Sequence, residues 1–295
     1  MKWGSNKVTI NNYSDIFKDY SKDIKEVIRS AILDDTPIEK YIDLYKGNPY
    51  MLWQVKMSLD EGIEEDLIRL LDSGIILKEL RDMNNRGINI NPLKKYFKRG
   101  LSYSHYEYIL KWYKEGYVLD KYDFDILPTT LLEVFDYGLH LGYSMDIFNN
   151  GVPLSRDYIL NCIRIMSNGK SVDKFLKGDW DIENLILLSR FSKSRYYDRF
   201  IGYIDKEITP SVLEELYFCC MEGVPLDEVA VKNSDGVYVY SGIHISKIRE
   251  AFNNNWDYKE LLNPDLSIKE LNKMIIDMQY NSNKKLSGRL RKKLI

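Results

Sequence analysis

The segment Gly142-Tyr-Ser-Met-Asp146 is one of six junctions in which a glycine lies four positions before a polar residue. The other five are Gly62-Ile-Glu-Glu-Asp66, Gly87-Ile-Asn-Ile-Asn91, Gly116-Tyr-Val-Leu-Asp120, Gly169-Lys-Ser-Val-Asp173 and Gly223-Val-Pro-Leu-Asp227. Three degenerate junctions lack the glycine: Asp35-Thr-Pro-Ile-Glu39, Ser194-Arg-Tyr-Tyr-Asp198 and Asn255-Trp-Asp-Tyr-Lys259. The polar residues that end these junctions recur at intervals of 25 to 32 residues. A period of about 27 residues is typical of a repeat protein.

Residues 173–198 illustrate one repeat. Asp173 precedes a short apolar segment, and its carboxylate is expected to cap the first turn of a short helix. Gly178 is expected to end that helix. Asp181 then precedes residues 182–191, whose apolar side chains follow the spacing of one face of an amphipathic helix. Each repeat is therefore predicted to consist of a short helix followed by a longer one.

The same order predicts nine long helices along the chain. Their expected ranges are about 49–61, 75–86, 102–115, 129–141, 154–168, 181–193, 210–222, 243–254 and 267–280. A helix pair this short cannot bury its apolar face alone, so neighbouring repeats must supply the core. We expect an all-α fold, a right-handed α-solenoid of about nine short-helix/long-helix repeats.

The predicted array covers residues 35–265. Residues 1–34 are expected to form an N-terminal cap, with one charged helix over 14–33, because the first repeat has no preceding neighbour. Residues 266–295 are expected to form a C-terminal capping helix and a basic tail.

The interval between positions 227 and 259 is the longest. It contains Val237-Tyr-Val-Tyr240 after the turn signal Asp235-Gly236, which favours a small β-hairpin insertion near 229–242. The alternative is an irregular loop with a few packed valines. Insertions in solenoids often lie on the binding face, so Tyr238 and Tyr240 are candidate interaction residues.

Charge is unevenly distributed along the chain. The 295 residues carry a formal net charge of −2, and six basic residues with no acidic residue lie in 281–295. These candidate interaction residues are Lys284, Lys285, Arg289, Arg291, Lys292 and Lys293. Residues 1–280 therefore carry a formal charge of −8. The tail either attracts nucleic acid or an acidic protein surface, or serves only as a solubilising end.

The cysteines and the N-terminus indicate a cytoplasmic protein. Cys162, Cys219 and Cys220 are odd in number and lie in predicted helices, which argues against a disulfide framework. The chain shows no signal-peptide pattern at its start and no apolar run of membrane-spanning length, so no membrane association is expected.

No residue set predicts a catalytic, cofactor-binding or metal site. Gly169-Lys-Ser171 resembles the end of a phosphate-binding loop, but it lacks the first glycine and follows a predicted helix. His105, His140 and His244 are not at zinc-ligand spacing, and the cysteines are expected in the core. Asp120 and its acidic neighbours lack the pattern of a calcium loop. We therefore expect no cofactor and no enzyme activity.

Two tryptophans fall within predicted long helices. Trp53 and Trp112 are expected to lie in the core rather than to form a recognition row.

The recurring glycine–aspartate junction is similar to that of short-period α-helical repeat proteins, which occur in low-GC Gram-positive bacteria and their phages and mobile elements. The similarity covers residues 35–265 and rests on the six glycine junctions and the helix after each breaker. It implies an α-helical array and carries over no functional residue. We expect a protein-binding scaffold that captures another protein, for example a host defence component. The alternatives are a nucleic-acid-binding solenoid that uses the basic tail, and an enzyme whose site is assembled across repeats.

Overall fold

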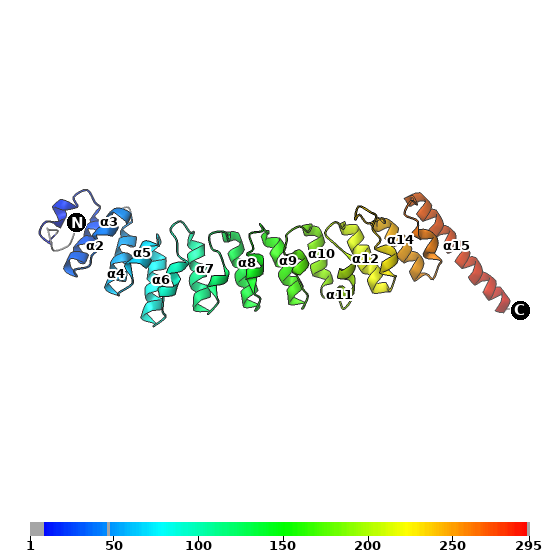
Figure 1. Ribbon diagram of the computed structural model, residues 1–295, viewed down its shortest axis with the longest axis horizontal. Coiled ribbons are helices and arrows are strands. Elements are labelled where there is room, and N and C mark those ends of the chain that lie inside the picture. Colours follow the sequence, from blue (N-terminus) through cyan, green and yellow to red (C-terminus); the bar gives the residue numbers. More distant parts are fainter. Residues whose placement is uncertain (1–8, 46–47, 294–295) are drawn as a thin grey trace. The chain divides into compact units, whose positions relative to one another are not determined.

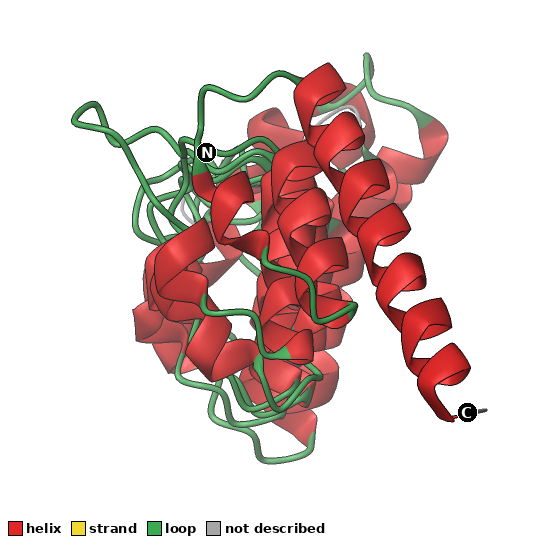
Figure 2. Ribbon diagram, turned by 90° about the vertical axis from the view of Figure 1, so that its right-hand side faces the viewer, coloured by secondary structure: helices red, strands yellow, loops and turns green. Residues whose placement is uncertain are grey.

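The computed structural model describes residues 9–45 and 48–293, with side chains up to Lys284. It divides into two compact units, Met1–Tyr137 and Gly138–Ile295, and the boundary falls inside one long helix (Figure 1). The described residues form helices joined by turns and loops, and they contain no β-strand (Figure 2). The predicted all-α class is therefore confirmed for this part of the chain.

Short elements alternate with long helices in both units, as predicted. The elements of the first unit are α1 (Tyr13–Ile16), α2 (Lys22–Leu33), α3 (Glu39–Tyr45), α4 (Pro49–Asp60), α5 (Glu65–Arg69), α6 (Gly74–Asn85), η1 (Asn91–Lys95), α7 (Tyr103–Lys114), η2 (Leu119–Lys121) and most of α8 (Thr129–His140). Those of the second unit are η3 (Met145–Phe148), α9 (Arg156–Ser167), η4 (Asp173–Phe175), α10 (Ile182–Phe191), α11 (Tyr197–Phe200), η5 (Ile201–Tyr203), α12 (Pro210–Glu222), α13 (Leu226–Val229), α14 (Gly242–Asn253), η6 (Tyr258–Leu262) and α15 (Ile268–Lys293).

Long helices that follow one another in the sequence pack side by side within each unit. In the first unit α2 contacts α4 and α4 contacts α6, and in the second unit α9, α10, α12, α14 and α15 follow one another in the same way. Fully buried side chains such as Leu52 of α4 and Leu77 of α6 fill the space between successive helices. The core of each unit is therefore built from nearest neighbours, as in repeat proteins.

All six junction glycines end a long helix in the left-handed conformation, with φ between 72° and 84°. In the junction at Gly116, for example, the amide of Tyr117 donates to the carbonyl of Trp112 at 2.9 Å. That bond closes the end of α7 in the manner of a Schellman motif. Asp35 and Asn255 take the same conformation in two of the degenerate junctions, with φ of 54° and 55°.

The polar residue that ends each junction does not cap the short helix, so this prediction is wrong. Asp120 and Asp173 lie inside the first turn of η2 and η4, and neither element has a side-chain capping bond. The Asp120 carboxylate instead binds Lys95 of the preceding repeat at 2.5 Å. Asp181 does cap a long helix as predicted, since its side chain accepts from the amide of Glu183 at 2.7 Å.

The expected single helix over 14–33 is two helices. The chain turns after α1, and the Ser21 side chain accepts from the Ile24 amide at 3.3 Å to begin α2. At the other end, the helix predicted to stop at 280 continues as α15 to Lys293. Residues 281–293 are rich in Lys, Arg and Leu, which favour helix, and contain no proline.

The β-hairpin predicted near 229–242 is a tight loop. One isolated antiparallel bridge joins Lys232 and Tyr238, and the amide of Val239 donates to the carbonyl of Val231 at 3.0 Å. The turn uses Gly236, whose φ is 81°. The pairing is too short to form a β-ladder, because Tyr240 turns into the core immediately afterwards.

Candidate interaction surfaces

The two candidate tyrosines, Tyr238 and Tyr240, hold the 231–239 loop against the rest of the second unit. Tyr240 is only 5% exposed, and its hydroxyl donates to the carbonyl of Leu262 at 2.5 Å. Tyr238 is half-buried, and its hydroxyl donates to the carbonyl of Tyr203 at 3.0 Å. The Lys232 ammonium lies 4.6 Å from the centre of the Tyr238 ring. Most of the surface of both tyrosine side chains therefore contacts other residues of the second unit. Burial raises the pKa of both hydroxyls.

The basic segment lies on α15 rather than on an extended tail. Lys284 is exposed on this helix. Lys285, Arg289, Arg291, Lys292 and Lys293 belong to its helical backbone, and their side chains lie outside the described part. The hydroxyls of Tyr238 and Tyr240 donate to Tyr203 and Leu262, neither of which lies on α15.

The motifs that resembled active-site features have structural roles. Lys170, in the sequence similar to a phosphate loop, binds Asp198 at 2.5 Å, and Gly169 ends α9. The buried His105 has its Nε2 atom 2.8 Å from the carbonyl oxygen of Leu127. His244 makes the equivalent contact with Leu261 at 2.7 Å. His105 therefore joins the start of α7 to the segment after η2, and His244 joins the start of α14 to η6 itself.

The three cysteines are buried free thiols. Burial raises the pKa of Cys162 and of Cys219 to about 12, and it also raises that of Cys220. A nucleophilic cysteine requires the opposite shift, toward thiolate at neutral pH. These side chains therefore act as small core residues.

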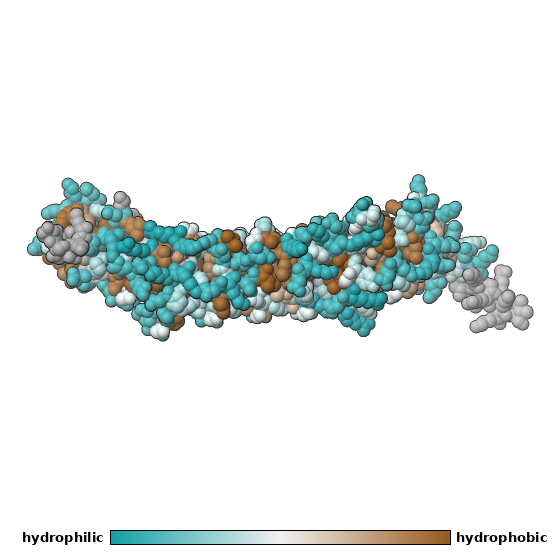
Figure 3. Space-filling model, in the orientation of Figure 1, coloured by the Kyte–Doolittle hydropathy of each residue, from teal (hydrophilic) through white to brown (hydrophobic). Residues whose placement is uncertain are grey.

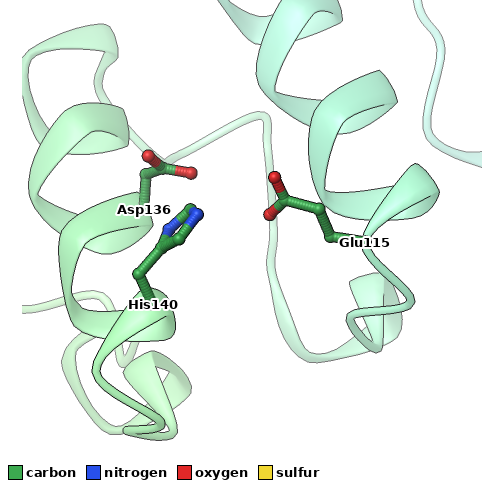
Figure 4. Close-up of side chains that lie close together, drawn as sticks. All are labelled: Glu115, Asp136 and His140. Atoms are coloured by element: carbon green, nitrogen blue, oxygen red, sulfur yellow. The ribbon is translucent and has the colours of Figure 1, made fainter.

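Glu115, Asp136 and His140 offer atoms that lie within 4.8 Å of one another (Figure 4). Asp136 already accepts two hydrogen bonds from α7: one oxygen binds Lys111 at 2.7 Å and the other binds the indole nitrogen of Trp112 at 2.9 Å. These bonds hold α8 against α7. Because hydrogen-bond donors of α7 already contact both carboxylate oxygens, Asp136 serves as a helix–helix contact, and we assign no metal site to these three residues.

A pocket of 520 Å³ lies in the second unit between η4 and the segment after η5. Its lining residues are Asp173, Lys174, Lys177, Asp179, Trp180, Ile204, Asp205 and Lys206. Lys206 binds Asp179 at 2.9 Å, Lys232 binds Asp205, and Lys174 donates to the carbonyl of Ile201 at 2.7 Å. A charged ligand would have to displace these ion pairs and this hydrogen bond. Because the lining holds both acidic and basic residues, it indicates no single class of ligand.

Exposed apolar side chains recur near the starts of the long helices in the first unit. Tyr50 and Trp53 of α4, Ile75 of α6 and Tyr103 of α7 are 47%, 41%, 54% and 45% exposed. We call these four residues the helix-start row. The Tyr50 ring packs against Gly74, where an added Cβ would come within 2.8 Å of the ring. Tyr50 therefore lies beside the start of α6, next to Ile75.

Sequence reasoning missed this row. Trp53 was expected in the core but is exposed, whereas Trp112 is fully buried as expected. Apolar patches also interrupt the hydrophilic surface on the face drawn in Figure 3. An apolar residue at the first or second position of α4, α6 and α7 is the sequence signal that would have found most of the row.

No protein-family model, curated protein or solved structure matches this chain. Within the residues described, no helix has both the length and the apolar character needed to cross a bilayer.

Proposed function

We propose that this chain is a non-catalytic scaffold that binds another protein, and that its repeats form a right-handed α-solenoid. The observation that carries the proposal is the helix-start row, which presents two tyrosines, one tryptophan and one isoleucine on three successive long helices. Aromatic side chains are enriched in protein interfaces, and Trp and Tyr supply much of their binding energy.

The polar chemistry of the described surface supports the same proposal. Carboxylates that could serve catalysis or metal binding instead link neighbouring repeats, as in the pairs Lys94–Asp66 at 2.7 Å and Lys259–Glu228 at 2.5 Å. These pairs hold side chains in place between repeats. The resemblance of the junctions to repeat proteins of phages and mobile elements favours a host factor, such as a defence component, as the partner.

The test compares the tagged wild-type chain with a variant of the helix-start row. The variant carries Tyr50→Ser, Trp53→Ser, Ile75→Ser and Tyr103→Ser, which remove exposed apolar surface. The matched control carries Val118→Ser and Ile126→Ser, two residues of the same unit that are equally exposed but lie beside the short element η2. Circular dichroism first establishes that all three proteins have the same helical content.

Each protein is then used to capture partners from the native host, with quantification by mass spectrometry. We expect the wild type and the control to retain one protein in stoichiometric amount and the row variant to lose it. Equal retention by the row variant would contradict the proposal. Recovery of nucleic acid alone would contradict it as well.

A further inference from the structure

We propose that the outward face of α15 is a second docking surface, and that its partner is an acidic amphipathic helix. The inference deepens the protein-binding function proposed above and depends on it. It rests on the packing of α15, on the exposed apolar side chains of that helix and on its charge.

In the part of the second unit that the structure describes, α15 packs against α14 through one face and exposes the other. α12 and α14 each contact a preceding and a following long helix, and α15 contacts α14. Leu271 and Ile275 are buried on the face toward α14. The residues on the opposite side of α15 are exposed, and because the long helices of this unit pack side by side, a helix is the segment that fits there.

The uncovered face carries the two most exposed large apolar side chains of the described chain. Ile276 is 63% exposed and Tyr280 is 68% exposed, and the two residues are one helical turn apart. Exposed apolar side chains on neighbouring turns of one helix are typical of a surface that another helix covers.

Basic residues lie on the same face. Lys269, Lys273, Ile276, Tyr280 and Lys284 follow one another at intervals of three or four residues, which places them along one side of α15. All three lysines are exposed. A partner helix with apolar residues in its centre and carboxylates along its edges would complement this face.

The length of α15 extends this charged surface. α14 has 12 residues and α15 has 26, so α15 is about 20 Å longer than the helix it packs against. Figure 1 shows its C-terminal part continuing past α14. Residues 281–295 add six basic residues and no acidic one. Residues 269–295 hold eight basic and two acidic residues in total, and this excess of positive charge favours an acidic partner.

Two other occupants are less favoured. Nucleic acid would leave the exposed side chain of Ile276 without an apolar partner. A second copy that paired through its own α15 would bring lysines against lysines, which is repulsive.

The test uses the full chain and three synthetic probes of matched length. The first is an amphipathic helical peptide with Leu in its apolar stripe and Glu at its edges. The second replaces Glu with Lys, and the third is a single-stranded oligonucleotide. Binding is measured by fluorescence anisotropy at about 50 mM and about 500 mM salt, because screening weakens exposed charge pairs. We expect the acidic peptide to bind at least about tenfold more tightly than either other probe, and to weaken in high salt.

Three variants locate the binding. Ile276→Ser with Tyr280→Ser should weaken the acidic peptide about tenfold, and Lys269→Glu with Lys273→Glu should reverse the preference between the two peptides. The control, Ile243→Ser with Lys193→Glu, changes exposed residues elsewhere in the second unit and should bind like the wild type. Circular dichroism verifies the folding of each variant.

Equal binding by the wild type and the Ile276/Tyr280 variant would overturn the inference. A preference for the oligonucleotide would overturn it too, as would a dimer in sedimentation that the Ile276/Tyr280 variant loses. If the helix-start row variant loses its host partner while the acidic peptide binds no better than the basic one, this inference alone fails. If the acidic peptide binds as expected but no host protein depends on the row, the proposed function of the row fails instead.

Discussion

Arg81 of α6 and Arg249 of α14 occupy the same position, the eighth residue of their helices, one in each unit. Arg81 donates to the Gln54 side chain at 2.9 Å and to the Glu61 carboxylate at 2.6 Å. Both acceptors belong to the preceding long helix or its C-terminal cap. The arginine thus ties two successive long helices together.

Arg249 repeats these contacts in the second unit. It donates to Glu215 at 3.0 Å and to Glu222 at 2.9 Å, which hold the sixth and thirteenth positions of α12. Asn85 and Asn253, one turn after each arginine, donate to the same glutamates at the end of the preceding helix. The two clamps therefore show that equivalent repeats use equivalent polar contacts.

We predict that Arg81→Ala lowers the free energy of unfolding by about 1–3 kcal/mol, because it removes two charge-assisted hydrogen bonds from partly buried acceptors. Arg249→Ala should have a similar effect in the second unit. The measurement is urea unfolding followed by circular dichroism.

Arg86→Ala is the matched control, since Arg86 is exposed at the end of α6. Its unfolding midpoint should equal that of the wild type. If Arg81→Ala behaves like this control, the clamp does not stabilise the helix pair.

The clamp also predicts a dependence of stability on pH. Hydrogen bonding to Arg81 holds the pKa of Glu61 below its ordinary value of 4.5. Because the folded-state pKa is the lower one, Glu61 contributes stability fully above pH 4.5 and loses it as the pH falls through the folded-state value. Unfolding midpoints measured between about pH 6 and pH 3 should therefore decrease less steeply for Glu61→Gln than for the wild type. Parallel curves would mean that Glu61 contributes nothing to the acid sensitivity.

Gly223→Ala is expected to lower the free energy of unfolding by about 1–2 kcal/mol. Gly223 has a φ of 84°, a conformation that an L-residue adopts only at a cost. An added Cβ would meet no atom within 4 Å, so the cost would come from the backbone alone.

Gly202→Ala provides the comparison within the same unit. Gly202 has equal space for a Cβ and does not have a positive φ. Thermal unfolding should therefore separate the two variants, with Gly202→Ala within about 0.5 kcal/mol of the wild type.

The cysteines should resist labelling in the folded protein. Burial raises the pKa of Cys162 and Cys219 to about 12, so the reactive thiolate is scarce at neutral pH and the sulfur is shielded. A thiol-specific reagent at about pH 7.5 should label fewer than one cysteine per folded chain and all three in urea. Rapid labelling of the folded chain would show that the second unit opens readily.

The ends of the long helices could be predicted because each depends on a single residue. A glycine that must take a left-handed conformation is recognisable without knowledge of its neighbours, and Gly116 and Gly142 behave as predicted. The role of Asp120 could not be predicted in this way. Its partner, Lys95, comes from another repeat, and only the stacking of repeats brings the two charges together.

Burial was predictable only where the spacing of apolar residues was clear. Residues 50–53 of α4 are Tyr, Met, Leu and Trp. Four consecutive residues span about one helical turn, so apolar side chains lie on every side of the helix there. Periodicity cannot decide which of them face the core, and the neighbouring helices bury Met51 and Leu52 while leaving Tyr50 and Trp53 exposed. Tyr240 was misplaced for a related reason, because its valine-rich surroundings indicated a strand rather than a core contact.

The ion pairs between repeats have a consequence for how such a chain evolves. Lys170 reaches Asp198, and Lys95 reaches Asp120, so each pair closes a loop of a single repeat. A chain built of such local contacts can gain or lose a whole repeat by duplication or deletion without breaking contacts elsewhere. Its length is therefore a property that selection can adjust in steps of about 27 residues.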